Sequence, residues 1–287
     1  MEVRVTPGSR YIVSTSGRAS SMRRYLVLLQ EILRIDVVYM PIGEHDGGKI
    51  DPERFAWALR GLNSIGGAIS KDIKGAIVPY LDVVDELARA VGAVNTVIRR
   101  GPRLLGYNTD AMGFEQAITA GILDLPIRAA VCYGYGGVTS VVVAVLHRMG
   151  IEVYITGRSR DSAARRAAEL GARLYDSDSA SCCAQFLGAG ALFVNAAPVT
   201  DRPLEEAPNF LQALAACTVA FDHEMPGAAL REHCRAHGIK HIAGESMYSP
   251  FRACGAHVAT FLGEGLGRSV YSAQLLSESC VSLLALP

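Results

Sequence analysis

The chain has 287 residues, of which 50% are hydrophobic and 20% are charged, and this composition is typical of a globular protein rather than a disordered one. Its 28 lysines and arginines balance its 28 aspartates and glutamates, so the formal net charge is zero. That balance argues against a strongly basic surface of the kind that binds nucleic-acid phosphates or an anionic membrane. We therefore expect a small-molecule partner, with no nucleic acid and no membrane.

The chain length favours two domains, because single hydrophobic cores stop growing beyond about 250–300 residues. The first residues contain no apolar signal segment, and no stretch reaches the roughly 18 apolar residues that a membrane span needs. The seven cysteines are an odd number without CxxC spacing, so we expect reduced, buried thiols. These features favour a cytoplasmic protein, which we expect to be a monomer or a homodimer.

The first hundred residues alternate short apolar runs with amphipathic segments. YIVS, VVYMPI and GGAIS are strand candidates, and MRRYLVLLQEILR, FAWALRGL and VVDELARAV are helix candidates. Strands that alternate with helices favour a parallel or mostly parallel sheet. A further helix, AMGFEQAITAGIL at 111–123, leads into the next part of the chain.

From residue 128 the pattern is strand, helix, strand. RAAVCYGYGG at 128–137 is an apolar run that ends in glycines, TSVVVAVLHRMG at 139–150 is an apolar helix, and IEVYITGRS at 151–159 is a second strand. We expect more strands at 191–198, 217–223 and 239–244, and helices after residue 250.

A GxGGxxS turn lies between the first of these strands and its helix. Gly134 permits the tight turn, Gly136 lets backbone N–H groups approach a pyrophosphate, and the small Ser140 lets helix and strand pack closely. The position inside a strand-helix-strand unit favours a dinucleotide site. The alternative is a glycine-rich turn that binds nothing.

The second strand ends in arginines rather than a carboxylate. Arg158 and Arg160 follow it, where NAD-binding proteins place an acid for the ribose hydroxyls. Guanidinium groups suit a ribose 2′-phosphate, so we expect NADP rather than NAD as the cofactor. Arg158 is the first candidate, since Arg160 also fits an ordinary solvated cation.

Three stretches, GAISKDIKG at 67–75, VGAVNTV at 91–97 and GYNTDAMGF at 106–114, resemble the substrate-site segments of the shikimate and quinate dehydrogenase family. The similarity continues through the glycine turn to FVNAAP and to a GxxM element. It implies an α/β protein of two domains. Residues 1–110, completed by helices in 246–287, would form the substrate-binding domain, and 111–245 a Rossmann-type, doubly wound NADP-binding domain.

The resemblance also assigns roles. Lys74 and Asp110 would be catalytic, because oxidising a secondary alcohol with a nicotinamide requires a group that takes the hydroxyl proton as hydride leaves. The substrate-binding residues implied are Ser20, Ser70, Asn95 and Thr109. The cofactor-binding residues implied are Gly134, Gly136, Gly137, Val138, Thr139, Arg158, Ser159, Asn195 and Ala196.

Several substrate-reading positions depart from the family pattern. Met22 stands at the position of the second serine of the SxSP segment. The tyrosine of a DxxYNP segment is absent from the stretch around Met225, and the glutamine expected soon after the GxxM element is absent too. We therefore expect the chemistry to be retained and the substrate to differ. An arginine, Arg18, Arg23 or Arg252, is a candidate to hold an acidic substrate.

Two other functions stay open. The same fold could act on quinate, an amino-shikimate or another alcohol, or it could serve as a cofactor- or metabolite-sensing module without turnover. His233, His237 and His241 have metal-ligand spacing, but a glycine at 238 should end their helix, so we expect no metal site. The role of Lys71 is also open.

Overall fold

The computed structural model of the chain describes residues 5–15, 30, 34, 36–42, 49–61, 63–70, 73–176, 190–198, 204, 207–223 and 228–248. The expectations for Arg18, Ser20, Met22, Arg23, Lys71, Met225 and Arg252, and for helices after residue 250, lie outside the described residues. The described part separates into two compact units, one ending at Met112 and the other spanning Gly113–Tyr248.

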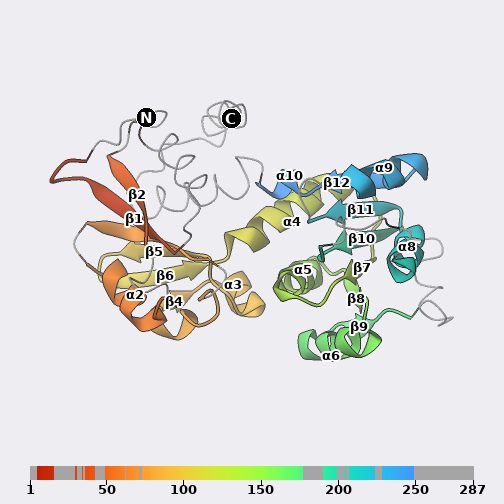
Figure 1. The fold of residues 1–287 in the computed structure, drawn as a ribbon, viewed down its shortest axis with the longest axis horizontal. Coiled ribbons are helices and arrows are strands. Elements are labelled where there is room, and N and C mark those ends of the chain that lie inside the picture. The colour runs from red at the N-terminus through yellow and green to blue at the C-terminus, as the bar shows by residue number, and fades with distance from the viewer. Residues whose placement is uncertain are drawn as a thin grey trace. The chain divides into compact units, whose positions relative to one another are not determined.

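The first unit contains a six-stranded mixed sheet with short helices (Figure 1). Its elements are β1 (Arg10–Ser14), β2 (Val37–Pro41), α2 (Pro52–Leu59), β3 (Ser64–Ala68), η2 (Val78–Tyr80), β4 (Val83–Val84), α3 (Glu86–Val91), β5 (Thr96–Arg100), β6 (Arg103–Tyr107) and the start of α4 (Thr109–Ile122).

The strand order of this sheet is β2-β1-β3-β5-β6-β4. β1 pairs in parallel with β2 and β3, and β4 pairs in parallel with β6, but β5 is antiparallel to both β3 and β6. The expectation of a mostly parallel sheet is therefore confirmed for the described strands, of which β5 runs opposite to the other five. The β5–β6 hairpin turns at Gly101, whose φ of 59° suits glycine, and its strands were not among the predicted elements.

Local signals explain helix α2 and its packing. Asp51 accepts a hydrogen bond from the Arg54 N–H and caps the helix, and Pro52 occupies the first turn. Phe55 and Leu59 are buried on the face that meets β3. A Cβ at Gly67 in β3 would lie 2.9 Å from the Leu59 Cδ2 and 3.1 Å from the Phe55 Cζ, so glycine allows this close approach.

The second unit is a six-stranded sheet of parallel strands with helices on both faces. Its elements after α4 are β7 (Ala129–Tyr133), α5 (Gly137–Arg148), β8 (Glu152–Thr156), α6 (Arg160–Leu170), β9 (Arg173–Leu174), β10 (Ala191–Asn195), α8 (Pro208–Ala215), β11 (Val219–Asp222), α9 (Ala228–Ala236), β12 (Lys240–Ala243) and α10 (Glu245–Tyr248).

The strand order of the second sheet is β12-β11-β10-β7-β8-β9, and all its pairs are parallel. Figure 1 shows α5 and α8 on opposite sides of this sheet. The order reverses between β7 and β10, which is the point where open α/β sheets bind ligands. The predicted α/β class with a doubly wound domain is thus confirmed.

The interior of the second unit is apolar. The rings of Phe193 and Tyr133 each meet the Phe210 ring edge to face, with centroids 4.9 Å apart. Cys132, Cys217 and Cys234 are buried free thiols, as expected for these three. Burial raises the pKa of the Cys132 thiol to about 12, so this thiol is inert. Among the described residues, no helix has both the length and the apolar character needed to cross a membrane.

We predict that Gly67→Ala lowers the stability of the first unit. The new methyl group would press on Leu59, Phe55 and the Val13 carbonyl oxygen, 3.1 Å away, and such overpacking costs about 1–3 kcal/mol. Thermal unfolding should occur several degrees lower than in the wild type. Gly8→Ala is the matched control, since its nearest heavy atom would be the Thr6 Oγ1 at 3.8 Å. Equal unfolding temperatures for all three proteins would contradict the close packing of α2 on β3.

Candidate functional site

The start of helix α4 positions one side of the candidate site. The Asn108 Oδ1 accepts a hydrogen bond from the Ala111 N–H at 3.0 Å, and its Nδ2 donates to the Ala93 carbonyl at 2.9 Å. Asn108 thereby caps the helix and anchors it to the segment before β5. Asp110 consequently lies in the first turn, where the helix dipole favours a carboxylate.

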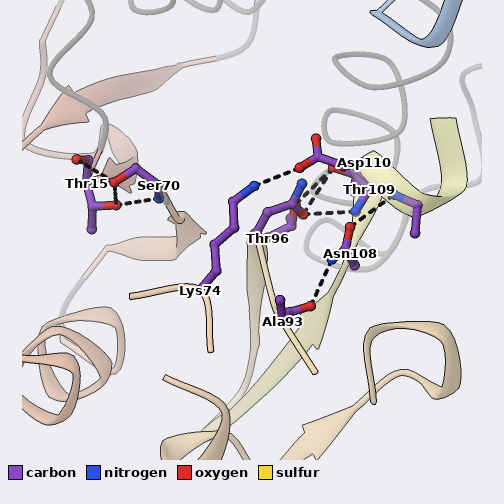
Figure 2. A network of polar contacts seen from close by, with 10 residues as sticks. Thr15, Ser70, Lys74, Ala93, Thr96, Asn108, Thr109 and Asp110 are labelled. Carbon is purple, nitrogen blue, oxygen red and sulfur yellow. Dashed lines mark hydrogen bonds and ion pairs between the residues drawn. The ribbon is translucent and has the colours of Figure 1, made fainter. Parts of the chain in front are cut away.

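Lys74 and Asp110 form the central ion pair of the site (Figure 2). The Lys74 Nζ lies 2.7 Å from the Asp110 Oδ2, and the two side chains are 29% and 26% exposed. Lys74 belongs to a turn at residues 73–77, and its carbonyl accepts a hydrogen bond from the Val94 N–H at 2.8 Å. The pair is therefore held by backbone contacts yet is still open to a ligand.

Asn95 is fixed in one orientation. Its Oδ1 accepts hydrogen bonds from the Thr109 N–H at 2.9 Å and from the Thr96 hydroxyl at 2.9 Å. A backbone N–H can only donate, so this contact identifies the oxygen of the Asn95 amide. Among the described residues none accepts a hydrogen bond from the Asn95 Nδ2. Asn95 therefore presents the N–H groups of its Nδ2 as hydrogen-bond donors to a ligand.

Thr109 is placed behind Asn95. It is completely buried, and its hydroxyl lies 3.2 Å from the Asn95 Oδ1 as a further donor to that atom. The sequence predicted a substrate contact for Thr109, whereas this geometry favours an indirect role through Asn95. Thr96, which sequence reasoning did not single out, has the same role and is also completely buried. The only signal for Thr96 in the sequence was its place in the VNTV stretch.

Ser70 contacts Thr15, a residue that the sequence analysis also missed. Both follow strands of the same sheet, Thr15 after β1 and Ser70 after β3, and their hydroxyl groups are 2.9 Å apart. Figure 2 shows this pair together with Lys74 and Asp110.

The glycine turn of the second unit has the form expected for an anion site. Gly134 has a φ of 131°, and a Cβ there would lie 3.0 Å from the Ala196 carbonyl atoms, so only glycine fits. At Gly136 and Gly137 a Cβ would meet no heavy atom within 4 Å. Helix α5 begins at Gly137 without a side-chain cap, which leaves its first N–H groups for a phosphate. The turn therefore fits a dinucleotide pyrophosphate.

Two other predicted cofactor residues, Thr139 and Asn195, use their side chains for hydrogen bonds inside the protein. Thr139 is fully buried, and its hydroxyl donates to the Gly134 carbonyl at 3.0 Å. The Asn195 Nδ2 donates to the Asp222 Oδ1 at 2.9 Å, and its Oδ1 accepts from the Ala197 N–H at 3.2 Å. These side-chain atoms are occupied by the protein itself. Val138, in the first turn of α5, and the Ala196 backbone lie beside the turn.

The two arginines after β8 have different environments. The Arg160 Nη2 pairs with the Asp176 Oδ2 at 3.1 Å. Arg158 is exposed, and no hydrogen bond or ion pair joins its guanidinium to another described residue. The Ser159 Oγ accepts from the Ser162 N–H at 3.2 Å and caps α6. Arg158 is therefore the better placed of the two for a ribose phosphate.

The Tyr135 side chain, which the sequence analysis did not single out, packs against Gly157. A Cβ at Gly157 would lie 2.8 Å from the Tyr135 Cε1, so the ring covers the glycine at the end of β8. Tyr133 lies close by. Burial raises the pKa of the Tyr133 hydroxyl, and the positive charge of Arg158 opposes part of that rise. The glycine turn and Arg158 thus lie in one neighbourhood.

The histidine cluster does not converge on one point. The His233 and His237 rings stack with centroids 4.1 Å apart at the end of α9, and His241 lies on β12. In the described ranges no group of three or more metal-ligating side chains could hold an ion.

Comparison with known proteins gives close relatives, although no protein-family model matches the chain. The shikimate dehydrogenase (NADP(+)) of Symbiobacterium thermophilum is 34% identical over 215 residues, which cover 70% of this chain and 72% of the relative. The enzyme of the same name from Halothermothrix orenii is 35% identical over 138 residues, or 46% of each chain. For several relatives, including the Halothermothrix enzyme, the matched region thus spans about half of the relative's length.

Solved structures agree with the fold. The shikimate 5-dehydrogenase of Listeria monocytogenes, determined in complex with shikimate and NAD, matches with a TM-score of 0.75 at 21% identity. The match covers 97% of this chain and 98% of the Listeria chain. At this level of identity the likeness concerns the fold.

We predict that Arg158→Ala weakens NADP binding by about 10- to 100-fold, the loss expected when a charge-assisted hydrogen bond to a phosphate is removed. NAD binding should change little, because NAD lacks the 2′-phosphate. Arg160→Ala is the matched control, since Asp176 already pairs with that guanidinium. Titration of each variant with both dinucleotides measures the effect. A larger loss of NADP affinity in Arg160→Ala than in Arg158→Ala would contradict this assignment.

Proposed function

The chain belongs to the shikimate/quinate dehydrogenase family, and we propose that it is an NADP-dependent oxidoreductase that interconverts a secondary alcohol and a ketone on a shikimate-like cyclic hydroxy acid. The observation that carries this proposal is the Lys74–Asp110 pair, with 2.7 Å between Nζ and Oδ2. A partly exposed lysine and carboxylate in contact can move a proton to and from a bound hydroxyl group.

The proposed mechanism divides the work among four side chains. NADP, when bound, supplies the hydride acceptor. Lys74, in its amine form, takes the proton from the hydroxyl group that is being oxidised, and the resulting ammonium group returns it in the reverse direction. Asp110 holds the Lys74 Nζ in place, and the Asn95 Nδ2 donates to a substrate oxygen. Thr109 acts through Asn95, because its hydroxyl and its N–H both contact the Asn95 Oδ1.

The second unit is proposed to bind the cofactor. The uncapped start of α5 would hold the pyrophosphate, and Arg158 with Ser159 would face the ribose 2′-phosphate. The names of the Symbiobacterium and Halothermothrix relatives specify NADP(+), which supports the same choice. The first unit would bind the substrate.

The identity of the substrate is the open part of the proposal. The expected departures at Met22 and Met225 favour an altered grip on the ring or its acid group, so quinate, an amino-shikimate or another alcohol is the second candidate. A sensing module without turnover is disfavoured, since binding alone does not require a lysine–carboxylate pair. A cytoplasmic location and a monomeric or homodimeric state remain predictions from the sequence.

We predict that the wild type forms NADPH with shikimate and that Lys74→Ala lowers turnover by about 10²–10⁴-fold, the usual range for removing a general base. NADP affinity should be unchanged. Lys49→Ala is the matched control, because Lys49 is an exposed lysine of the same unit. NADPH absorbance follows turnover with shikimate and with quinate.

The outcomes separate the alternatives. Turnover that survives in Lys74→Ala would refute the proposed base. A wild type that binds NADP but oxidises neither acid would retain the cofactor assignment and reject the shikimate-like substrate.

A further inference from the structure

Thr15 and Ser70 form a closed set of three hydrogen bonds, here called the Thr15–Ser70 clasp (Figure 2). The Ser70 N–H donates to the Thr15 Oγ1 at 2.6 Å. The Thr15 hydroxyl donates to the Ser70 Oγ at 2.9 Å, and the Ser70 hydroxyl donates to the Thr15 carbonyl at 3.1 Å. Nothing in the sequence motifs assigns a role to Thr15.

The directions of these bonds follow from counting protons. A carbonyl oxygen can only accept, so the contact with the Thr15 carbonyl uses the single proton of the Ser70 hydroxyl. The contact between the two hydroxyl groups must then use the proton of Thr15, whose Oγ1 also accepts from the Ser70 N–H. The Ser70 Oγ therefore retains one lone pair and no proton for a ligand.

The backbone on both sides of the clasp is held by the sheet. The Thr15 N–H donates to the Ala68 carbonyl at 3.0 Å, and the Ile69 N–H donates to the Asn95 carbonyl at 2.7 Å. Both residues are half-buried. Their hydroxyl groups are thus positioned by strands β1 and β3 rather than by a free loop.

We infer that Thr15 is a positioning residue that makes Ser70 an acceptor, so that Ser70 receives a hydrogen bond from a substrate hydroxyl group and does not hold the substrate carboxylate. A carboxylate at this point would face a lone pair. If the Ser70 proton turned toward a carboxylate, the Thr15 carbonyl would lose its hydrogen-bond donor, and this loss would offset much of the binding free energy gained from the carboxylate. This inference rests on the proposed function, since it concerns the substrate of the same site.

The site then has a defined arrangement of hydrogen-bond donors and acceptors. Asn95 presents a donor, Ser70 presents an acceptor, and the Lys74–Asp110 pair exchanges the proton. A cyclic polyol offers hydroxyl groups that can both donate and accept, and it matches this arrangement. The acid group of the substrate must then be bound by residues other than Ser70.

The test compares shikimate with its uncharged methyl ester in Thr15→Val, Thr15→Ser and Ser70→Ala. Valine keeps the branched shape of threonine but removes its hydroxyl, and serine restores that hydroxyl. Thr15→Val should raise KM by about five- to tenfold for both compounds, the loss of roughly one hydrogen bond, with kcat little changed. Thr15→Ser should resemble the wild type. Ser70→Ala should raise KM equally for the acid and for the ester. Adding Thr15→Val to Ser70→Ala should raise KM no further.

Other outcomes would overturn the inference. If Ser70→Ala raises KM for shikimate but not for the ester, Ser70 holds the carboxylate. If Thr15→Val has its full effect in the Ser70→Ala background, Thr15 acts elsewhere. Thr6→Val is the matched control, since it removes an exposed hydroxyl that donates to Asp36 in the same unit.

Amide hydrogen exchange tests the clasp without turnover. The Ser70 N–H should exchange faster in Thr15→Val than in the wild type, and Thr15→Ser should restore its protection. Equal exchange rates in all three would refute the clasp. A wild type that oxidises neither compound but shows the expected exchange pattern would reject the proposed function and keep the clasp.

Discussion

The candidate site depends on Asn95, which joins three elements of the first unit. Its N–H donates to the carbonyl of Tyr107 at the end of β6, and its carbonyl accepts from Ile69 just after β3. Its side-chain oxygen accepts from the Thr109 N–H in the first turn of α4. These contacts use groups that would otherwise be buried without partners, so they are costly to break. Every proposed substrate-site residue that the structure describes is Asn95 itself or lies within five residues along the chain of Asn95 or of one of its partners Ile69, Tyr107 and Thr109.

The consequence for chemistry is that donors and acceptors are fixed before a ligand arrives. The Asn95 oxygen is occupied, which leaves its amide nitrogen, and the Ser70 proton is occupied, which leaves its lone pair. Preorganised groups of this kind require little rearrangement during a reaction and contribute most where charge develops. The Lys74–Asp110 pair lies in the same network and completes a site suited to proton exchange with an alcohol.

The second unit shows which features a sequence specifies reliably. Parallel strands buried on both faces are nearly continuous apolar runs, so β7, β8, β10, β11 and β12 were all predicted from their composition. The glycine turn was predicted as well, because a positive φ and close backbone approach leave few alternatives to glycine. The β5–β6 hairpin was missed, since its strands mix arginines with apolar residues and show no clear alternation. As a result the antiparallel pairing in the first sheet was missed too.

The sequence by itself determined the α/β class and the glycine turn with its following arginines, because these depend on local backbone conformation and on short spacings that the chain carries directly. Lys74, Asn95 and Asp110 were predicted as site residues through the resemblance of their motifs to the family. Only the tertiary structure decided that Thr109 and Thr96 serve Asn95, that Asp176 pairs with Arg160 and that Thr15 directs the proton of Ser70. Each of these contacts depends on which way a side chain points and which distant segment it meets, and the order of residues along the chain does not contain that information.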